Sequence, residues 1–401
     1  MTDLTICVPT RNRQRYCIET IRAIARSESR DFDVIVADNS DDPSVLAEFF
    51  ANEFHDDRFR LLPPGDRVYS MVDNWDRTMP EATGRWVVFI GDDDYIDPRV
   101  SLLIKRYERL HPDVEAVGWN RMHFNWPDNR QSATLATVPC SFQTLLARKS
   151  ILQDRLFRWT ERANRPSAGF GIYHGAVKRS LMERIKRKFG DRYFEHPNVD
   201  YDNSCKVIAE AKTLVHCQRG FSVLGACKSS NSAATQNRDI RLERTRVFVA
   251  ETTGNVPPQH AGFPFSISDE SVSICVSVAH TTLWFCTTYG IDLTGFPENF
   301  AHSAIQECAR ARDREEYDIK VAAFRRGFAE WEGGIWASAF DPAPYATGER
   351  ILNETSGVIG DILYIREKKL NVETPGEFYR FGENAMLPVD LVVSGARTFA
   401  R

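Results

Sequence analysis

The predicted fold depends on one stretch of sequence, Arg85-Trp86-Val87-Val88-Phe89-Ile90-Gly91-Asp92-Asp93-Asp94-Tyr95-Ile96-Asp97-Pro98. Its β-branched and aromatic residues from Trp86 to Ile90 are typical of a buried strand. Three carboxylates follow Gly91, and they repel one another unless a cation or a cationic ligand lies beside them. Ligands bind at the carboxyl ends of strands in parallel sheets, and Mg²⁺ and Mn²⁺ take oxygen ligands. We therefore interpret the stretch as a metal–phosphate site; a solvated acidic turn is the alternative.

The composition is that of an ordinary globular protein. The chain has 401 residues, of which 42% are hydrophobic and 26% are charged, and this length predicts two or more domains. The net charge of -4 argues against a general nucleic-acid binder. Nine scattered cysteines without a CxxC pair favour reduced thiols in a cytoplasmic protein over a disulfide framework. We predict neither a signal peptide nor a membrane-spanning helix.

Strand-like and helix-like segments alternate through the first hundred residues. Strands are predicted at 4–8, 32–37, 59–62 and 86–90, with helical patterns between them. This alternation indicates βαβ units and a parallel sheet with helices on both faces. Asp38 ends the second strand, where it is placed to accept hydrogen bonds from a nucleotide, although an Asx-turn is the commoner fate of such a residue. The chain has no GxGxxG after the first strand and no GxxxxGK[ST], which disfavours a Rossmann dehydrogenase and a P-loop phosphotransferase.

Three motifs together resemble a family 2 glycosyltransferase of the GT-A fold. They are Val8-Pro9-Thr10-Arg11-Asn12-Arg13, Val36-Ala37-Asp38-Asn39-Ser40 and Phe89-Ile90-Gly91-Asp92-Asp93-Asp94. The resemblance implies an α/β fold with a mostly parallel sheet and a DXD-type motif, in which Asp93 and Asp94 hold Mn²⁺ or Mg²⁺. Gly91 stands where many members have the first Asp, so the register of the motif is open by one position. The implied nucleotide-sugar contacts are Pro9, Thr10, Arg11, Asp38, Asn74, Asp92 and Lys228.

A second constellation, Pro197-Asn198-Val199-Asp200-Tyr201-Asp202-Asn203, resembles the acidic pair that supplies the family's catalytic base, with Val199 in place of a Glu. Inverting transfer needs a base that takes the proton of the acceptor hydroxyl, and the resemblance assigns this role to Asp200. Service of Asp200 and Asp202 as helix caps is the alternative. The candidate acceptor contacts are His174, Tyr173, Trp119 and Asp202, for which a structural role in the core is the competing interpretation.

We therefore predict a GT-A domain over 1–235 and a mainly helical C-terminal domain over 236–401. The second domain serves acceptor binding, dimerisation into a homo-oligomer or docking on the inner membrane face. The predicted function is metal-dependent inverting transfer of a sugar from a nucleotide diphosphate donor to a carbohydrate or lipid-linked saccharide acceptor, in polysaccharide or glycolipid biosynthesis. A nucleotide-sugar-binding protein without turnover and a nucleotidyltransferase are the alternatives. The predicted location is cytoplasmic, with peripheral membrane contact left open.

Overall fold

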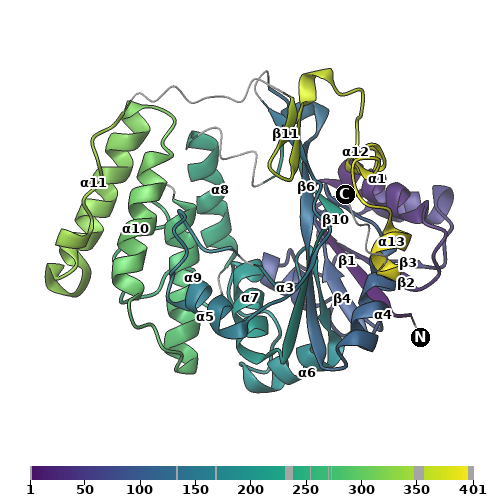
Figure 1. Ribbon diagram of the computed structural model, residues 1–401, viewed down its shortest axis with the longest axis horizontal. Helices are drawn as coiled ribbons and strands as arrows, with labels where there is room; N and C mark the ends of the chain where they lie inside the picture. Colours follow the sequence, from purple (N-terminus) through teal and green to yellow (C-terminus); the bar gives the residue numbers. More distant parts are fainter. Residues whose placement is uncertain are drawn as a thin grey trace.

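A central sheet with helices on both faces forms the body of the molecule, and a further group of helices lies beyond one face (Figure 1). The computed structural model describes residues 2–131, 134–167, 169–230, 238–252, 254–269, 271, 273–346 and 356–395. All nine cysteines are free thiols, as predicted.

One half of the sheet is parallel. Its strands are β1 (Leu4–Thr10), β2 (Phe32–Asp38), β3 (Phe59–Leu62) and β4 (Trp86–Phe89), in the order β4-β1-β2-β3. Leu4 of β1 lies opposite Phe32 on one side and Trp86 on the other, so β1 is covered on both edges. The connecting helices are α1 (Gln14–Ala25), α2 (Ser44–Glu48) with its π-helical continuation (Phe49–Glu53), and α3 (Met71–Asp76). This parallel order brings the carboxyl ends of β1, β2 and β4 to one edge.

The other half of the sheet has mixed strand directions. Strand β9 (Gly175–Lys178) runs antiparallel to both β4 and β6 (Val114–Asn125), and β10 (Thr213–Ala226) runs parallel to β6. The remaining strands are β5 (Tyr95–Ile96), β7 (Leu135–Pro139) and β8 (Thr144–Leu146), all antiparallel to their partners. The predicted α/β class with flanking helices is confirmed, and the parallel arrangement is concentrated in the β4-β1-β2-β3 half.

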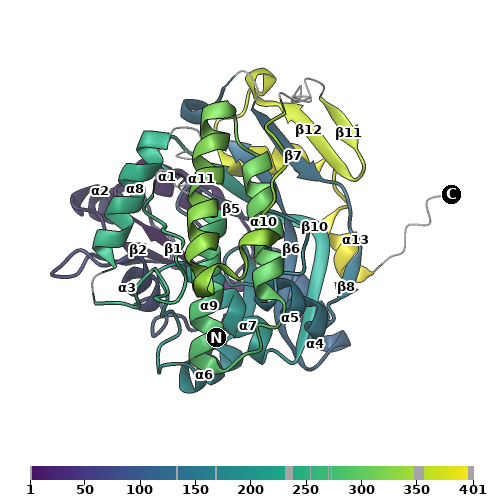
Figure 2. The same cartoon turned by 90° about the vertical axis from the view of Figure 1, so that its left-hand side faces the viewer.

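Two sets of helices cover the faces of this sheet. The helices that follow the strands are α4 (Val100–Leu110), α5 (Lys149–Phe157), α6 (Arg179–Lys188) and α7 (Val199–Glu210). The outer group consists of α8 (Arg238–Glu251), α9 (Ile274–Tyr289), α10 (Phe296–Ala309) and α11 (Arg314–Glu330), which stand in front of the sheet in Figure 2. Phe285 and Cys286 of α9 pack in the same apolar cluster as α6 and α7, which joins the two groups. In the described part of the chain, no helix has the length and apolar character needed to cross a membrane.

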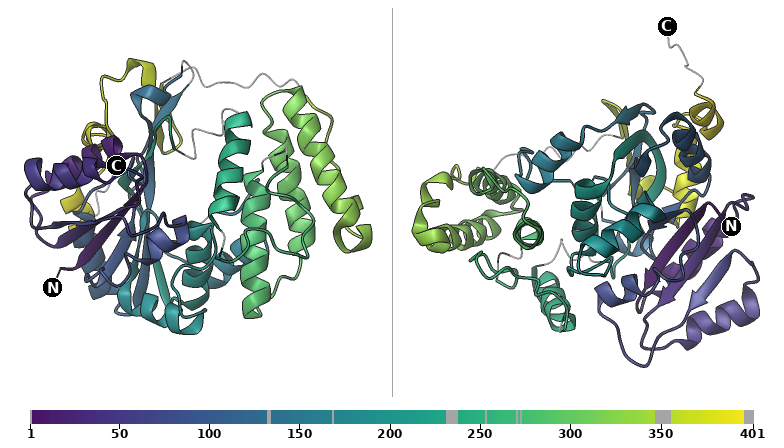
Figure 3. Two further views of the ribbon diagram at one scale, coloured as in Figure 1. Left: turned by 180° about the vertical axis from the view of Figure 1, so that it is seen from behind. Right: turned by 90° about the horizontal axis from the view of Figure 1, so that it is seen from below.

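The last described segment returns to the N-terminal half of the molecule. Strand β12 (Ile362–Arg366) pairs with β7 and with β11 (Gly357–Ile359), which extends the sheet. Helix α12 (Pro375–Glu383) and helix α13 (Val389–Ser394) lie beside the first strands and helices in Figure 3. Their side chains Phe378, Tyr379 and Val389 belong to the same core as β1. The division of the chain at residue 235 stays a proposal, and these elements, like α9, belong to 236–401 and pack on the first domain.

Arg219 of β10 anchors this returning segment. Its side chain is fully buried, and its Nε donates to the carbonyl oxygen of Leu387 at 2.7 Å. Its Nη1 donates to the hydroxyl of Tyr379 at 2.9 Å, and its Nη2 lies 3.3 Å from Glu383 Oε1. A buried guanidinium is stable only when such acceptors surround it, so Arg219 and the C-terminal segment depend on one another.

We expect Arg219→Met to lower the free energy of unfolding by about 3 kcal/mol, because it leaves buried acceptors on α12 and on the segment after it without a donor. The measurement is urea unfolding followed by circular dichroism. Arg326→Met, at an exposed position on α11, is the matched control and should change the free energy by less than about 0.5 kcal/mol. Equal stability of the two variants would contradict the anchoring role.

Candidate functional site

The acidic motif lies where β4 ends beside β1. Thr10, the last residue of β1, donates its hydroxyl hydrogen to Asp92 Oδ2 at 2.6 Å. The guanidinium of Arg13, at the start of α1, contacts both oxygens of Asp92 at 2.6 and 3.1 Å, and its Nη1 lies 3.5 Å from Asp93 Oδ1. The parallel pairing of β1 with β4 therefore supplies the cation that the three adjacent carboxylates require.

Burial dominates the electrostatics of Asp92 and Asp93. Loss of water raises the pKa of both carboxyls, and the positive charge of Arg13 opposes this rise. Asp93 Oδ2 also accepts a hydrogen bond from the backbone N–H of Cys227 at 3.2 Å. A further cation in the site would therefore stabilise the charged forms of both carboxylates.

Asp94 has a different environment, because its carboxylate is fully engaged. It accepts hydrogen bonds from the N–H groups of Gly91 at 2.6 Å and Gly225 at 2.7 Å. The hydroxyl of Tyr173 and Nε2 of His174 each lie 2.8 Å from its Oδ2. Burial alone would raise the pKa of Asp94, but His174 and these hydrogen bonds hold it below its usual value. These contacts give Asp94 a structural role, because its Oδ2 has three partners and its Oδ1 accepts from Gly225.

A chain of hydrogen bonds runs from Trp119 to Asp94. The indole N–H of Trp119 donates to Ser222 Oγ at 2.9 Å, and Ser222 Oγ lies 2.8 Å from Nδ1 of His174. Burial lowers the pKa of His174, which favours a neutral ring. With one proton on the ring, Nδ1 accepts from Ser222 and Nε2 donates to Asp94. Trp119, His174 and Tyr173 therefore position the acidic motif from the side opposite Arg13.

The close approach of β10 to this motif requires a glycine. A Cβ added at Gly225 would lie 1.7 Å from the carbonyl oxygen of Asp93, a distance that no side chain tolerates. The backbone of β10 can therefore reach Asp93 and Asp94 only with glycine at this position.

A cavity of about 510 Å³ opens on the Arg13 side of the motif. Of the predicted nucleotide contacts, it brings together Pro9, Thr10, Arg11 and Asn74. The side-chain amide of Asn74 donates to the carbonyl oxygen of Ala37 at 3.3 Å, and its Oδ1 accepts from Arg77 Nε at 2.8 Å. Asn74 thus holds the end of β2 in place at the cavity wall.

Asp38 and Lys228 do not line this cavity, although their neighbours Asn39 and Ser229 do. Asp38 is fully buried, and its Oδ1 accepts from the N–H of Ser40 at 2.9 Å, which is the Asx-turn considered as the alternative. Its Oδ2 has no hydrogen-bond partner among the described residues. Lys228 is exposed, and its backbone N–H donates to Asp128 at 3.2 Å, while the neighbouring Ser229 lines the cavity.

Helix α8 closes the outer side of the same cavity. Glu251 forms an ion pair with Arg11, and Arg244 donates to the backbone carbonyls of Ser230 and Lys228. Phe248 of α8 also lines the cavity. The C-terminal half of the chain therefore contributes directly to the predicted nucleotide site.

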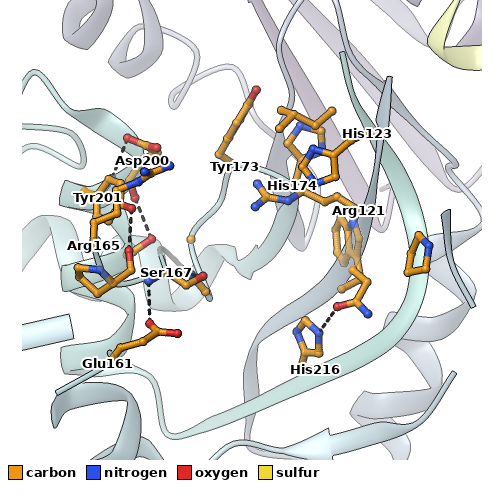
Figure 4. Close-up of a pocket in the computed structure, with 18 of the residues that line it drawn as sticks. Arg121, His123, Glu161, Arg165, Ser167, Tyr173, His174, Asp200, Tyr201 and His216 are labelled. Atoms are coloured by element: carbon orange, nitrogen blue, oxygen red, sulfur yellow. Dashed lines mark hydrogen bonds between the residues drawn. The ribbon is translucent and has the colours of Figure 1, made fainter. Parts of the chain in front are cut away.

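A second cavity, of about 740 Å³, lies on the Tyr173 side of the motif and contains the predicted base. Asp200 is in the first turn of α7 and half-buried, and burial raises the pKa of its carboxyl. Figure 4 shows Asp200, Tyr201 and Arg165 on one side of this cavity and Arg121, His123 and His174 on the other. The acidic motif thus contacts residues of both cavities, through Arg13 in the first and through Tyr173 and His174 in the second.

Asp202 lies outside this cavity. It is fully buried, its Oδ2 accepts from the N–H groups of Glu195 and His196, and Lys206 Nζ lies 3.1 Å from each of its oxygens. The side chain therefore ties residues 195 and 196 to α7 and does not cap the helix, whose N-cap is Asn198. This placement does not support an acceptor contact.

Residues 5–174 match the family model described as Glycosyl transferase family 2. This part of the chain is therefore similar in sequence to the domains that the family model describes. The GalNAc(5)-diNAcBac-PP-undecaprenol beta-1,3-glucosyltransferase of Campylobacter jejuni is 29% identical over 96 residues. The matched segment covers 23% of this chain and 30% of that relative, so the chain spans under a third of the relative's length.

The solved structures that resemble this chain include two of TarS from S. aureus. Residues 1-349 of TarS in complex with UDP-GlcNAc share 15% identity and a TM-score of 0.42, over 81% of this chain and 92% of that one. A second TarS structure shares 12% identity and a TM-score of 0.44, over 86% of this chain and 56% of that one.

Several residues of the site were not predicted. Arg13 is the last residue of the first motif, Val8-Pro9-Thr10-Arg11-Asn12-Arg13. Its position at the start of a helix, two residues after Arg11, could have indicated a role in the site. Arg121 and Arg165 carry no motif, because they reach the second cavity from β6 and from a loop that the fold brings together. Asn39 exchanges hydrogen bonds with the backbone of Tyr69 at 2.9 Å in both directions, a pairing that spacing alone does not indicate.

We expect Gly225→Ala to lower the free energy of unfolding by about 2 kcal/mol or more, because the new methyl group displaces either β10 or the backbone of Asp93. Gly357→Ala is the matched control, since a Cβ there meets nothing within 4 Å. The measurement is urea unfolding of both variants. If Gly225→Ala is as stable as Gly357→Ala, the close contact between β10 and the motif is wrong.

Proposed function

We propose that the protein transfers a sugar from a nucleotide diphosphate donor in the first cavity to a hydroxyl group of an acceptor in the second. The observation that supports this most directly is the position of the acidic motif between the two cavities. A donor whose nucleotide fills the first cavity would place its diphosphate near Arg13 and Asp93 and its sugar toward Asp200. The C. jejuni relative is named for glucosyl transfer to a saccharide on undecaprenol diphosphate, which is consistent with this reaction class.

A divalent cation fits the carboxylate of Asp93 better than its neighbours. Asp94 accepts hydrogen bonds at both oxygens, three of them at Oδ2, and Asp92 is held by Thr10 and Arg13. Asp93 Oδ1 lies 3.5 Å from the nearest nitrogen of Arg13, which is beyond a normal ion-pair hydrogen bond. Mg²⁺ or Mn²⁺ bound there would neutralise the departing diphosphate. The described residues contain no group of three or more ligating side chains, so substrate phosphate oxygens and water have to complete the coordination.

Different residues of the chain have different roles in the proposed transfer. Arg11, Asn39 and Asn74 line the nucleotide cavity, and Arg13 orients Asp92 and Asp93. Asp200 takes the proton as the acceptor oxygen attacks the anomeric carbon, and the bond from that carbon to the diphosphate oxygen breaks. Attack from the side of Asp200, opposite the diphosphate, inverts the anomeric configuration.

The proposal also covers the cellular location of the protein and its oligomeric state. A cytoplasmic enzyme that contacts the inner membrane face, or that forms a homo-oligomer, stays a prediction. Arg184 and Lys188 of α6 pair with Glu115 and Glu210, which reduces the positive charge that this helix offers to a membrane.

We expect Asp93→Ala to abolish metal-dependent binding of the donor, and Asp200→Asn to remove transfer while donor binding stays within about threefold. Calorimetry with UDP-, GDP- and dTDP-sugars, with and without Mn²⁺, measures binding, and chromatography of the products measures transfer. Asp57→Ala, at an exposed position, is the control. Transfer by Asp200→Asn at the wild-type rate would refute the assigned base. If the wild type binds the donor without turnover, the protein is a nucleotide-sugar-binding protein. If it transfers a nucleotidyl group, it is a nucleotidyltransferase.

We expect the rate of transfer to rise with pH, with a midpoint above the usual carboxyl value of 3.8. Burial raises the pKa of Asp200, and the base works only when deprotonated, so activity is lost as pH falls through this raised value. The measurement is kcat against pH at saturating donor. A midpoint at or below 3.8 would show that the burial of Asp200 does not control the base.

A further inference from the structure

The second cavity contains a positive charge without a partner. Arg121 projects from β6, and its guanidinium points into the cavity in Figure 4. Its side chain is exposed to the cavity, and no hydrogen bond or ion pair to it occurs among the described residues. An arginine held inside a concave site without a carboxylate is available to bind an anionic ligand.

Arg165 adds a second positive charge beside the base. It lies on the loop after α5, close to Tyr201 and Asp200. Arg121, Arg165 and Asp200 line the same cavity, and the positive charges of both arginines act to lower the pKa of the Asp200 carboxyl. Two permanent cations therefore lie in the cavity that holds the proposed base.

Carboxylates and histidines also line the cavity. Glu161 accepts a hydrogen bond from the N–H of Ser167 at 3.1 Å, and Asp361 accepts one from the hydroxyl of Ser141. Burial lowers the pKa of His123 and of His216, so both rings are neutral near pH 7. Among the charged groups of the cavity, Arg121 is a guanidinium that has no ion pair in the described part of the chain, so an anionic ligand can pair with it.

Given the proposed transfer reaction, we propose that the acceptor is an acidic saccharide or polyol whose carboxylate or phosphate group is bound by Arg121 and Arg165. The anion positions a neighbouring hydroxyl at Asp200. That oxygen forms the new bond to the anomeric carbon, its proton passes to Asp200, and the donor diphosphate leaves with the electron pair of the broken bond. Arg11 and Arg13 line the first cavity, where they pair with Glu251 and with Asp92, whereas Arg121 and Arg165 line the second cavity beside the acceptor.

Binding of simple anions tests this site without any need for turnover. The probes are methyl β-glucuronide and glycerol 2-phosphate, with methyl β-glucoside and glycerol as neutral counterparts, and the measurement is saturation-transfer NMR. We expect at least one anionic probe to bind tenfold more tightly than its neutral counterpart, and Arg121→Ala or Arg165→Ala to remove that preference. Arg13→Ala should keep the preference, because its guanidinium belongs to the first cavity, and Arg326→Ala should keep it as a surface control.

The outcomes separate the acceptor proposal from the proposed transfer reaction. If neither anion binds better than its neutral counterpart, or if Arg121→Ala and Arg165→Ala both retain the preference, the acceptor proposal is wrong even where donor binding is normal. If the preference is lost in Arg13→Ala instead, the anion binds in the donor cavity and the proposal is also wrong. If the donor does not bind at all, the transfer reaction fails, while the anion measurement still reports on Arg121. With an active donor, Arg121→Lys should raise the acceptor KM less than Arg121→Ala does, with a smaller change in kcat than in KM.

Discussion

Burial of three consecutive carboxylates at the end of a strand is the constraint on which the rest of the structure depends. The three carboxylates have different partners. Asp92 forms an ion pair with Arg13 and accepts a hydrogen bond from Thr10. Asp94 has four hydrogen-bond partners, and Asp93 has the longest contacts of the three. Since uncompensated negative charge is costly away from water, the elements that supply these partners have to converge. The end of β1, the start of α1, the loop before β9 and the backbone of β10 all meet at this motif.

The same convergence divides the surface around the motif into two cavities. The first is built by the parallel half of the sheet and covered by α8, so that the C-terminal region completes a cavity that begins at Pro9. The second is built by β6, α7 and the loops near them, and it holds Asp200 with three arginines, Arg121, Arg165 and Arg310. Asp94 lines neither cavity and contacts Tyr173 and His174 of the second.

Prediction from the sequence was accurate for features that depend on local pattern. The strands at 4–8, 32–37 and 59–62 and the strand leading to the motif form as expected, because runs of β-branched residues between turn signals favour buried parallel strands. The gathering of Pro9, Thr10, Arg11 and Asn74 at one cavity follows from the polarity of a parallel sheet. The individual roles of Asp92, Asp93 and Asp94 were not predictable, because alternate side chains at a strand end diverge and their partners come from Arg13, His174 and Gly225, distant in sequence.

The sequence by itself determined the α/β class, the family resemblance and the edge of the sheet that carries polar side chains, because hydrophobic periodicity and motif order encode these locally. Only the tertiary structure decided which carboxylate has the weakest protein contacts. It also decided that α8 covers the first cavity and that Arg121 and Arg165 line the same cavity as Asp200. Those properties depend on contacts between residues tens to hundreds of positions apart. A one-dimensional pattern carries no information on them, because burial and charge pairing arise only when the segments pack together.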